Sequence, residues 1–404
     1  MKMTIGMLAL LVAGTAFAAD VGHGSLPLGA GPQAKTEVVA VYYPHWHPYP
    51  VGEKVIFGEG RSEWELVKRQ KPRYEGHPVP IRPLMGYYDE TNPTNVEREI
   101  DMAADAGIDV FMYDWYFYGD RPMMDEALNR GYLKARNAAR VKFALMWCYH
   151  DRRNRFGARP EDPGAWVAKR DRTPEEFRRN FDWVLERYLP SPLYWRKDGK
   201  LFFSIFNAPD FVKAMGGAEK IRALLAEADA KAVAKGLGPI HWNAMQGKDF
   251  KAFAAAGFLS CSAYNITCHD LKDYKKRFAD KEQLFEYKDV ADAHRRIWKE
   301  RANLSGIVYI PTVTRGWDCS GRCHPDEPFP WRCGGYPYSG IVRNNTPELF
   351  RALLADAKAY AETSPQKPGV VLLNAWNEYT EGCWLVPDEN IGDASLKAIK
   401  SVFR

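Results

Sequence analysis

Short apolar runs alternate with longer amphipathic stretches along most of the chain. Eight runs rich in β-branched and aromatic residues predict strands at 38–43, 110–115, 142–148, 201–206, 240–244, 258–264, 307–313 and 370–376. A helical stretch is expected after each strand, and the clearest lie at 95–106, 174–187, 218–235, 290–303, 347–362 and 395–402. Because the strands are nearly all apolar, we expect both faces of the sheet to be covered.

Strict strand–helix alternation predicts a parallel sheet, and eight units favour its closure into a barrel. The fold class is therefore α/β: a single-domain (β/α)8 TIM barrel over residues 37–404, with long βα loops. A chain of 404 residues suits this fold, since such barrels exceed about 250 residues when loops carry insertions. The alternative is an open doubly wound sheet, but no Gly-rich phosphate loop follows the first strand.

The first 19 residues have the features of a signal peptide. Lys2 supplies a charge, residues 5–12 are apolar, and Ala16-Phe17-Ala18 forms a small-x-small cleavage site. Cleavage near Ala18 or Ala19 would leave an N-terminal tail over 20–36 and a secreted or periplasmic protein. The alternative is an internal start with a buried strand. No later stretch approaches the ~18 uninterrupted apolar residues of a membrane span.

Seven cysteines suit an exported protein. Cys319, Cys323 and Cys333 lie in one Gly- and Pro-rich segment, where a disulfide is a simpler interpretation than a zinc site with His324. The net charge of +5 is small for this length, and no long basic run occurs. Charge therefore gives no reason to expect a nucleic-acid partner.

Polar and aromatic residues gather where the predicted strands end, which is where barrels place reactive side chains. Carboxylates, amides and indoles dominate, and these groups suit sugar hydroxyls and sugar ring faces. The candidate substrate-binding residues are Tyr43, His45, Trp46, His47, Asp114, Trp115, Tyr116, Asn207, Trp242, Asn243, Tyr264, Trp317, Asp318, Trp376, Asn377 and Tyr379.

Several of these residues also have a purely structural interpretation. His45 and His47 could be packed histidines; a metal site is disfavoured because no third ligand is in register. Asp114 could cap or form a salt bridge, and Trp242 could belong to the core. Asp318 could anchor the cysteine-bearing loop.

Glu378 and Glu381 follow the eighth predicted strand and are the candidate catalytic pair. Glycoside cleavage needs one carboxylic acid to protonate the leaving oxygen and a second carboxylate as base or nucleophile. The neighbouring Trp376 and Trp384 could exclude water and so raise one pKa above the other. The alternative is that either glutamate only closes a salt bridge at the barrel mouth.

The segment from Asn374 to Gly382 resembles the N-E-W-x-E-G signature of WbsX-like bacterial polysaccharide proteins, which are similar to family 99 glycoside hydrolases. The opening Tyr42-Tyr43-Pro44-His45-Trp46-His47 resembles the Y-Y-P-x-W-H opening of the same family. Glu63-Trp64 with Lys68, and Gly107 to Tyr113, extend the match, which runs from near residue 38 to 387.

The resemblance implies a barrel that needs no cofactor and that hydrolyses α-mannosidic bonds with retention. Glu378 would assist through the substrate's 2-hydroxyl or act as nucleophile, and Glu381 would be the general acid/base. One departure follows the third strand, where WbsX-like proteins often read W-A-N-E-x-W. This chain reads Trp147-Cys148-Tyr149-His150-Asp151, so substrate contacts in that loop are expected to differ.

The expected function is that of a secreted glycoside hydrolase acting on a polysaccharide or complex glycan. An oligosaccharide or polysaccharide is the expected partner. The alternatives are a non-catalytic glycan-binding barrel and a WbsX-type glycosyltransferase.

Overall fold

The computed structural model describes residues 35–404. The predicted signal peptide and all but the last two residues of the predicted tail lie outside the described residues. Among residues 35–404, no helix combines the length and apolarity needed to cross a membrane.

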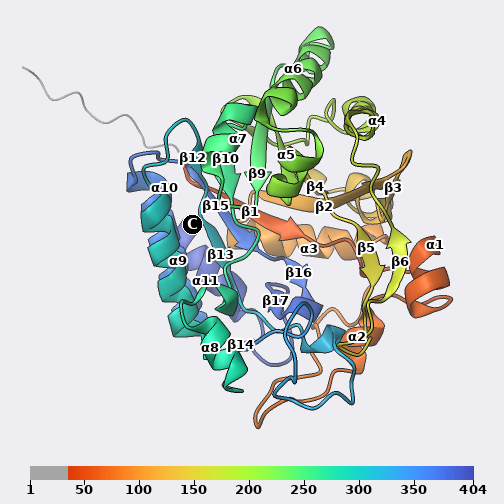
Figure 1. The fold of residues 1–404 in the computed structure, drawn as a ribbon, viewed down its shortest axis with the longest axis vertical. Helices are drawn as coiled ribbons and strands as arrows, with labels where there is room; N and C mark the ends of the chain where they lie inside the picture. Colours follow the sequence, from red (N-terminus) through yellow and green to blue (C-terminus); the bar gives the residue numbers. More distant parts are fainter. Residues whose placement is uncertain (1–34) are drawn as a thin grey trace, which may run out of the picture. The chain divides into compact units, whose positions relative to one another are not determined.

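The predicted (β/α)8 barrel is confirmed (Figure 1). Neighbouring barrel strands run parallel, in the order β12-β10-β9-β8-β4-β2-β1-β15-β13. The strands are β1 (Glu37–Tyr42), β2 (Val110–Tyr118), β4 (Lys142–Cys148), β8 (Lys200–Phe206), β9 (Ile240–Met245), β10 (Ser260–Ser262), β12 (Val308–Tyr309), β13 (Thr312–Thr314) and β15 (Val370–Asn374). The first strand, β1, pairs with the last, β15, so the sheet closes into a barrel.

The seventh predicted strand is split into β12 and β13. β12 pairs with β10, whereas β13 pairs with β15, so this broken strand joins the two edges of the sheet. The break falls at Ile310-Pro311, where proline has no N–H to donate. Ile310 N donates to Cys261 O, and Leu372 N donates to Pro311 O, both at 2.9 Å, which continues the ladder across the break.

Helices form the outer layer. They are α3 (Pro93–Ala106), α4 (Pro174–Arg187), α5 (Ala208–Ala214), α6 (Ala218–Ala234), α7 (Phe250–Ala256), α9 (Tyr287–Arg301), α10 (Pro347–Thr363) and α11 (Ala394–Phe403). The expectation of a regular helix after every strand is wrong after β2. Only the short turns η2 (Ala127–Gly131), η3 (Tyr132–Lys134) and η4 (Ala138–Arg140) follow it. Gly131 packs so tightly there that a Cβ would lie 2.1 Å from the Glu90 carbonyl oxygen.

Three of the outer helices begin with the same signal, a capping side chain followed by proline. Asn92 accepts from Thr94 N at 3.0 Å, Thr173 from Glu176 N at 3.2 Å, and Thr346 from Leu349 N at 3.3 Å. These caps fix where α3, α4 and α10 start, and hence how long the preceding loops are.

The long loops gather at the carboxyl ends of the strands. In Figure 1 the arrowhead of β1 points toward the side where β5, β6, β16 and β17 lie. The loop strands there are β3 (Arg121–Met123), β5 (Arg152–Asn154), β6 (Ala165–Ala168), β11 (Leu284–Glu286), β14 (Ile341–Arg343), β16 (Asn377–Glu378) and β17 (Cys383–Trp384), whereas β7 (Arg196–Lys197) pairs with the start of β8 at the amino end. The loop helices are α1 (Pro50–Gly52), η1 (Glu53–Phe57), α2 (Trp64–Lys68), η5 (Cys268–Asp270), α8 (Tyr274–Ala279), η6 (Ser320–Arg322) and η7 (Tyr379–Glu381).

All seven cysteines, which lie within the described residues, are free thiols, so the expected disulfide is not formed. The Cys323 thiol donates to the carbonyl oxygens of Cys319 and Pro337, at 3.5 and 3.6 Å, while Cys333 is exposed. Nor does any group of three or more His, Cys, Asp or Glu side chains in residues 35–404 have the arrangement of a metal site.

Candidate active site

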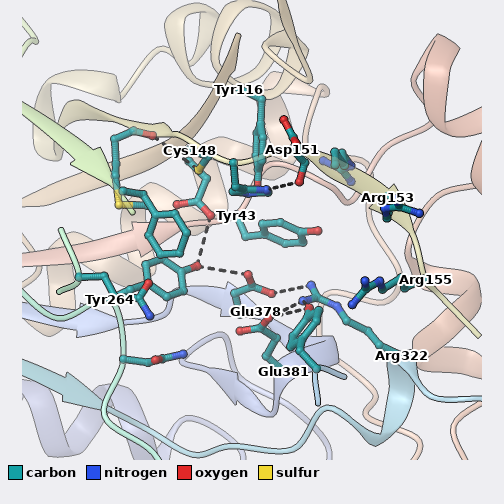
Figure 2. Close-up of a pocket in the computed structure, with 18 of the residues that line it drawn as sticks. Tyr43, Tyr116, Cys148, Asp151, Arg153, Arg155, Tyr264, Arg322, Glu378 and Glu381 are labelled. Carbon is teal, nitrogen blue, oxygen red and sulfur yellow. Dashed lines mark hydrogen bonds and ion pairs between the residues drawn. The ribbon is translucent and has the colours of Figure 1, made fainter. Parts of the chain in front are cut away.

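A cavity of about 630 Å³ opens at the mouth of the barrel, and the carboxylates of Glu378 and Glu381 line it (Figure 2). Its walls come from the ends of β1, β2, β4, β8 and β10 and from the loops that follow β4, β13 and β15. This volume lies in the range of about 300–1,000 Å³ that is usual for small-molecule sites.

A tight hairpin holds the acid pair. β16 and β17 pair antiparallel, with Glu378 opposite Cys383, and η7 forms the turn between them. Gly382 ends the turn with φ of 72°, and a Cβ there would lie 2.5 Å from Asp318 N. The sequence needs glycine at this point both for the left-handed backbone and for the close approach of the next loop.

Arg322, from η6, joins the two acids. Its Nη2 lies 3.0 Å from Glu378 Oε2, and its Nη1 lies 2.5 Å from Glu381 Oε1. The same guanidinium reaches Glu63 Oε1 at 2.9 Å. Tyr336 Oη donates to Glu381 Oε1 at 2.9 Å. One buried cation thus contacts three buried carboxyl groups, and it holds the acid pair together.

Glu63 lies behind Arg322 and is fully buried. Burial opposes its ionisation, but the charge of Arg322 and hydrogen bonds from His45 and Thr380 outweigh burial and hold the pKa of Glu63 below its usual value. Tyr43 Oη also donates to Glu63, at 2.8 Å. Glu63 is therefore the permanent anion of this cluster.

Glu378 has the opposite electrostatic environment. Burial, followed by repulsion from Glu381, raises its pKa well above the usual value. Burial also raises the pKa of Asp114. Tyr264 Oη lies 3.2 Å from both Asp114 Oδ2 and Glu378 Oε1. One hydroxyl hydrogen serves only one of these contacts, so the second bond needs a protonated carboxyl group. The site is built to retain a proton.

Some of the residues predicted from the sequence come together around this cavity. They are Tyr43, Asp114, Tyr116, Tyr264, Trp317, Glu378 and Glu381. They converge from β1, β2, the segment after β10, the loop after β13, and the β16–β17 hairpin.

Three other candidates on the mouth loops lie behind the cavity wall. Asn377 accepts from Tyr43 N at 2.7 Å and donates to Tyr43 O at 3.0 Å, so it fastens the eighth strand's loop to β1. Asp318 binds His77 at 2.8 Å. His45 contacts Glu63, and burial and the charge of Arg152 lower its pKa to about 3.

The remaining candidates do not line the cavity either. Buried indole N–H groups bond to structural partners: Trp115 to Asn180, Trp242 to Asp229, and Trp376 to Glu99. Trp46 packs against Trp64 and Tyr379, and His47 bonds to Glu90 at 2.8 Å. Asn243 bonds to Ser204 and Ser260 inside the barrel, and Asn207 holds the Tyr149 carbonyl oxygen.

Other residues of the cavity were not predicted from the sequence. Arg322 and Tyr336 lie in the cysteine-bearing loop, and Arg152 lies in the loop after β4. No local pattern marks them, because their loops are irregular and reach the site only through the fold. Further residues of this kind are Met146, Arg153, Arg155, Phe156, Trp166, Phe206 and His269.

Solved structures with the same architecture include glycoside hydrolases. A glycoside hydrolase-like protein superimposes with a TM-score of 0.58 and 15% identity, over 93% of this chain and 98% of its own. The GH99 endo-α-mannosidase from Bacteroides thetaiotaomicron gives a TM-score of 0.57 and 15% identity, over 91% of this chain and 96% of its own. At this identity, the likeness establishes the fold.

Among curated proteins, WxcX of Xanthomonas campestris pv. campestris strain B100, an uncharacterized protein, is 23% identical over 390 residues. The aligned region is 95% of this chain but 52% of WxcX, so the chain spans about half the length of this relative. The family model described as glycosyltransferase WbsX matches residues 38–399. The chain therefore belongs to the WbsX glycosyltransferase family.

Proposed function

We propose that this protein is a retaining glycoside hydrolase that cleaves a mannoside-like linkage in a polysaccharide or complex glycan. The observation that carries the proposal is the buried acid pair Glu378 and Glu381, joined by Arg322 at the edge of an open cavity. A shared guanidinium keeps the two carboxylates close, and retaining enzymes use the shorter separation of about 5 Å.

In this mechanism the proton that the buried cluster retains lies on Glu381 once substrate is bound, and Glu381 passes it to the glycosidic oxygen as the bond breaks. Glu378 takes the proton of the sugar's 2-hydroxyl, or attacks the anomeric carbon directly. The burial that raises the pKa of Glu378 also makes its carboxylate a stronger base. Water then attacks the anomeric carbon and Glu381 accepts the proton of the water, while Glu378 returns its proton to the 2-oxygen of the sugar or leaves the anomeric carbon as a carboxylate. Tyr43, Tyr116, Tyr264 and Trp317 supply the aromatic and hydroxyl surface for the sugar.

The family's description favours a second candidate, glycosyl transfer. The same acid pair would serve it, since a retaining enzyme that passes the sugar to a hydroxyl other than water is a transglycosylase. A non-catalytic glycan-binding barrel is the third candidate. We also propose that the protein is exported to the periplasm or the medium, because its first 19 residues have the features of a signal peptide.

The test compares Glu378→Gln and Glu381→Gln with the wild type on a panel of mannans and complex glycans. We expect each variant to release reducing ends at least ~10²-fold more slowly, the usual contribution of a positioned acid or base. Glu389→Gln is the matched control, because Glu389 is an exposed carboxylate whose only ion pair within residues 35–404 is with exposed Arg82.

Aryl glycosides separate the two roles. A good leaving group needs no protonation, so Glu381→Gln should recover activity on a nitrophenyl glycoside, whereas Glu378→Gln should not. Full turnover by both variants on every substrate would exclude this pair as the catalytic groups. Product formation only when a sugar acceptor is added would favour the transglycosylase, and binding without any product would favour the third candidate.

A further inference from the structure

An arginine-bearing ribbon forms one side of the cavity. β5 and β6 pair antiparallel, and Arg152, Arg153 and Arg155 all line the cavity. Arg153 and Arg155 share a face because side chains alternate along a strand. Arg152 would point away, but the register shifts between Arg152 and Arg153, and such a bulge re-aims a side chain. In Figure 2, Arg153 and Arg155 lie on the same side as Arg322, opposite Tyr264.

These three guanidinium groups have no carboxylate within ion-pair distance among the described residues. Other arginines nearby are paired: Arg322 with Glu378 and Glu381, and Arg172 with Asp151 at 2.9 Å. The acids that line the cavity are therefore already committed to other partners or, like Asp114, favoured as neutral by burial. The ribbon adds positive charge that the protein does not neutralise.

Neutral groups hold the ribbon's side chains in place. Arg153 Nη1 donates to Gly164 O at 3.1 Å, and Arg155 Nε donates to Pro163 O at 3.3 Å. The Arg153 guanidinium lies over the Trp166 ring, 3.5 Å from its centroid. Within residues 35–404, these contacts leave the Arg155 Nη1 and Nη2 and the Arg153 Nη2 free to donate. Free guanidinium donors are suited to a planar or tetrahedral anion.

Arg152 extends the positive charge inward. It is 7% exposed, and its guanidinium contacts His45 Nε2 at 2.5 Å and Tyr49 Oη at 3.4 Å. It also lies over the Tyr116 ring, 5.3 Å from the centroid. None of these neighbours provides a negative charge at neutral pH, since tyrosine and a histidine with a pKa of about 3 are uncharged. The nearest anion, Glu63, lies on the far side of the His45 ring, so Arg152 has no direct counter-ion and adds to the field felt by a ligand in the cavity.

We propose that the ribbon is an anion subsite and that the glycan bound in this cavity is acidic, with a carboxylate, sulfate or phosphate group placed against Arg153 and Arg155. This inference rests on the proposed function only in naming that glycan as the substrate; the anion subsite itself is independent of turnover. It also gives a role to the loop after β4, where the chain departs from the W-A-N-E-x-W pattern of its family.

The experiment measures binding by affinity electrophoresis in gels that contain one of four forms of a single polysaccharide. Chondroitin sulfate carries both anions, its desulfated form carries only carboxylates, its carboxyl-reduced form carries only sulfates, and the doubly treated polymer is neutral. We expect at least 10-fold tighter apparent binding to one or more anionic forms than to the neutral form. The anionic form that binds most tightly identifies the group the subsite prefers.

The variant Arg153→Gln/Arg155→Gln should lose at least 10-fold in binding to the preferred form and should retain its thermal midpoint. Arg196→Gln/Arg351→Gln is the matched control, because it also removes two positive charges from exposed arginines that have no ion pair among the described residues, and Arg196 likewise donates to a backbone carbonyl, that of Gly199. Equal losses in the two variants would attribute binding to net charge and overturn the subsite. So would equal binding of the neutral and anionic polymers. Neither outcome depends on whether Glu378 and Glu381 hydrolyse a glycan.

Discussion

At the scale of single residues, Arg322 is central to both charge and geometry in the cavity. Replacing it with methionine keeps much of its apolar bulk but leaves Glu63, Glu378 and Glu381 buried without a cation. Removing one partner of a buried ion pair costs about 3–5 kcal/mol, so we expect Arg322→Met to lower the free energy of unfolding by that amount at pH 7. Urea denaturation of the two proteins measures this loss.

The free energy of unfolding that Arg322→Met loses should be smaller at acidic pH than at pH 7. The pKa of Glu63 is lowered in the folded protein, so its stabilising contribution is present above its usual value of 4.5 and is lost as the pH falls below it. The difference in unfolding free energy between the wild type and Arg322→Met should therefore decrease as the pH is lowered. Arg351→Met, at an exposed helix position, should stay within about 0.5 kcal/mol of the wild type. A deficit under about 1 kcal/mol at pH 7, or one that widens in acid, would contradict this assignment.

Some residues of the site have a local signal in the sequence, and others have none. Glu378 and Glu381 were predicted as a pair because both follow one strand end and lie three positions apart. Arg322 precedes Glu381 by 59 positions, in a loop with no periodic pattern, so nothing local connects it to them. The indoles of Trp115, Trp242 and Trp376 illustrate the converse. A tryptophan at a strand end has the same sequence signature whether it faces the cavity or packs beneath it.

At the scale of elements, the β5–β6 ribbon is fastened to the barrel by one buried ion pair. Arg170 follows β6, and its Nη2 lies 2.7 Å from Glu176 Oε1 in the first turn of α4, with both side chains fully buried. The Arg170 guanidinium also lies over the rings of Trp147 and Tyr149, 4.2 and 4.4 Å from their centroids. The pair therefore joins β4, the ribbon and α4.

Replacing Glu176 with glutamine should break this junction. We expect a loss of about 3–5 kcal/mol, because Arg170 then remains buried without a counter-ion. Glu175→Gln is the control on the same turn. In the part of the chain that the structure describes, Glu175 pairs only with the partly exposed Arg178, so this change should alter stability by less than about 1 kcal/mol. Chemical denaturation compares the two, and similar small losses in both variants would show that the Arg170–Glu176 pair does not fasten the ribbon.

Elements were predicted more reliably than their contacts. The predicted strands all correspond to barrel strands, because apolar runs of that length between helical stretches have few other places in a fold. The helix starts at Pro174 and Pro347 were predicted to the residue, since a cap followed by proline is a local signal. The ribbon was not predicted: its strands are short, and their arginine-rich sequence lacks an apolar pattern.

At the scale of the whole molecule, the barrel closes where its two ends meet. β1 pairs with β15, and α11 packs against α10 and α3, so the last helix covers the seam between the first and last strands. Lys358 Nζ of α10 donates to Val402 O at 2.8 Å, and Arg404 donates to Ala104 O at 3.2 Å. The C-terminal helix is thereby part of the closure of the sheet.

Ile399 tests whether this closure is cooperative, because its side chain is fully buried on α11. Ile399→Ala should lower the free energy of unfolding by about 2–5 kcal/mol, from lost apolar burial and the cavity it leaves. If the seam is one cooperative unit, the slowest-exchanging amides of β1 and β15 should lose protection by the same free energy as the global unfolding measured by urea. Lys400→Ala, one position along on the exposed face, should leave both measurements within about 0.5 kcal/mol of the wild type. Loss of protection confined to α11, with the β1–β15 ladder unchanged, would mean that the last helix unfolds independently and that the strands alone close the barrel.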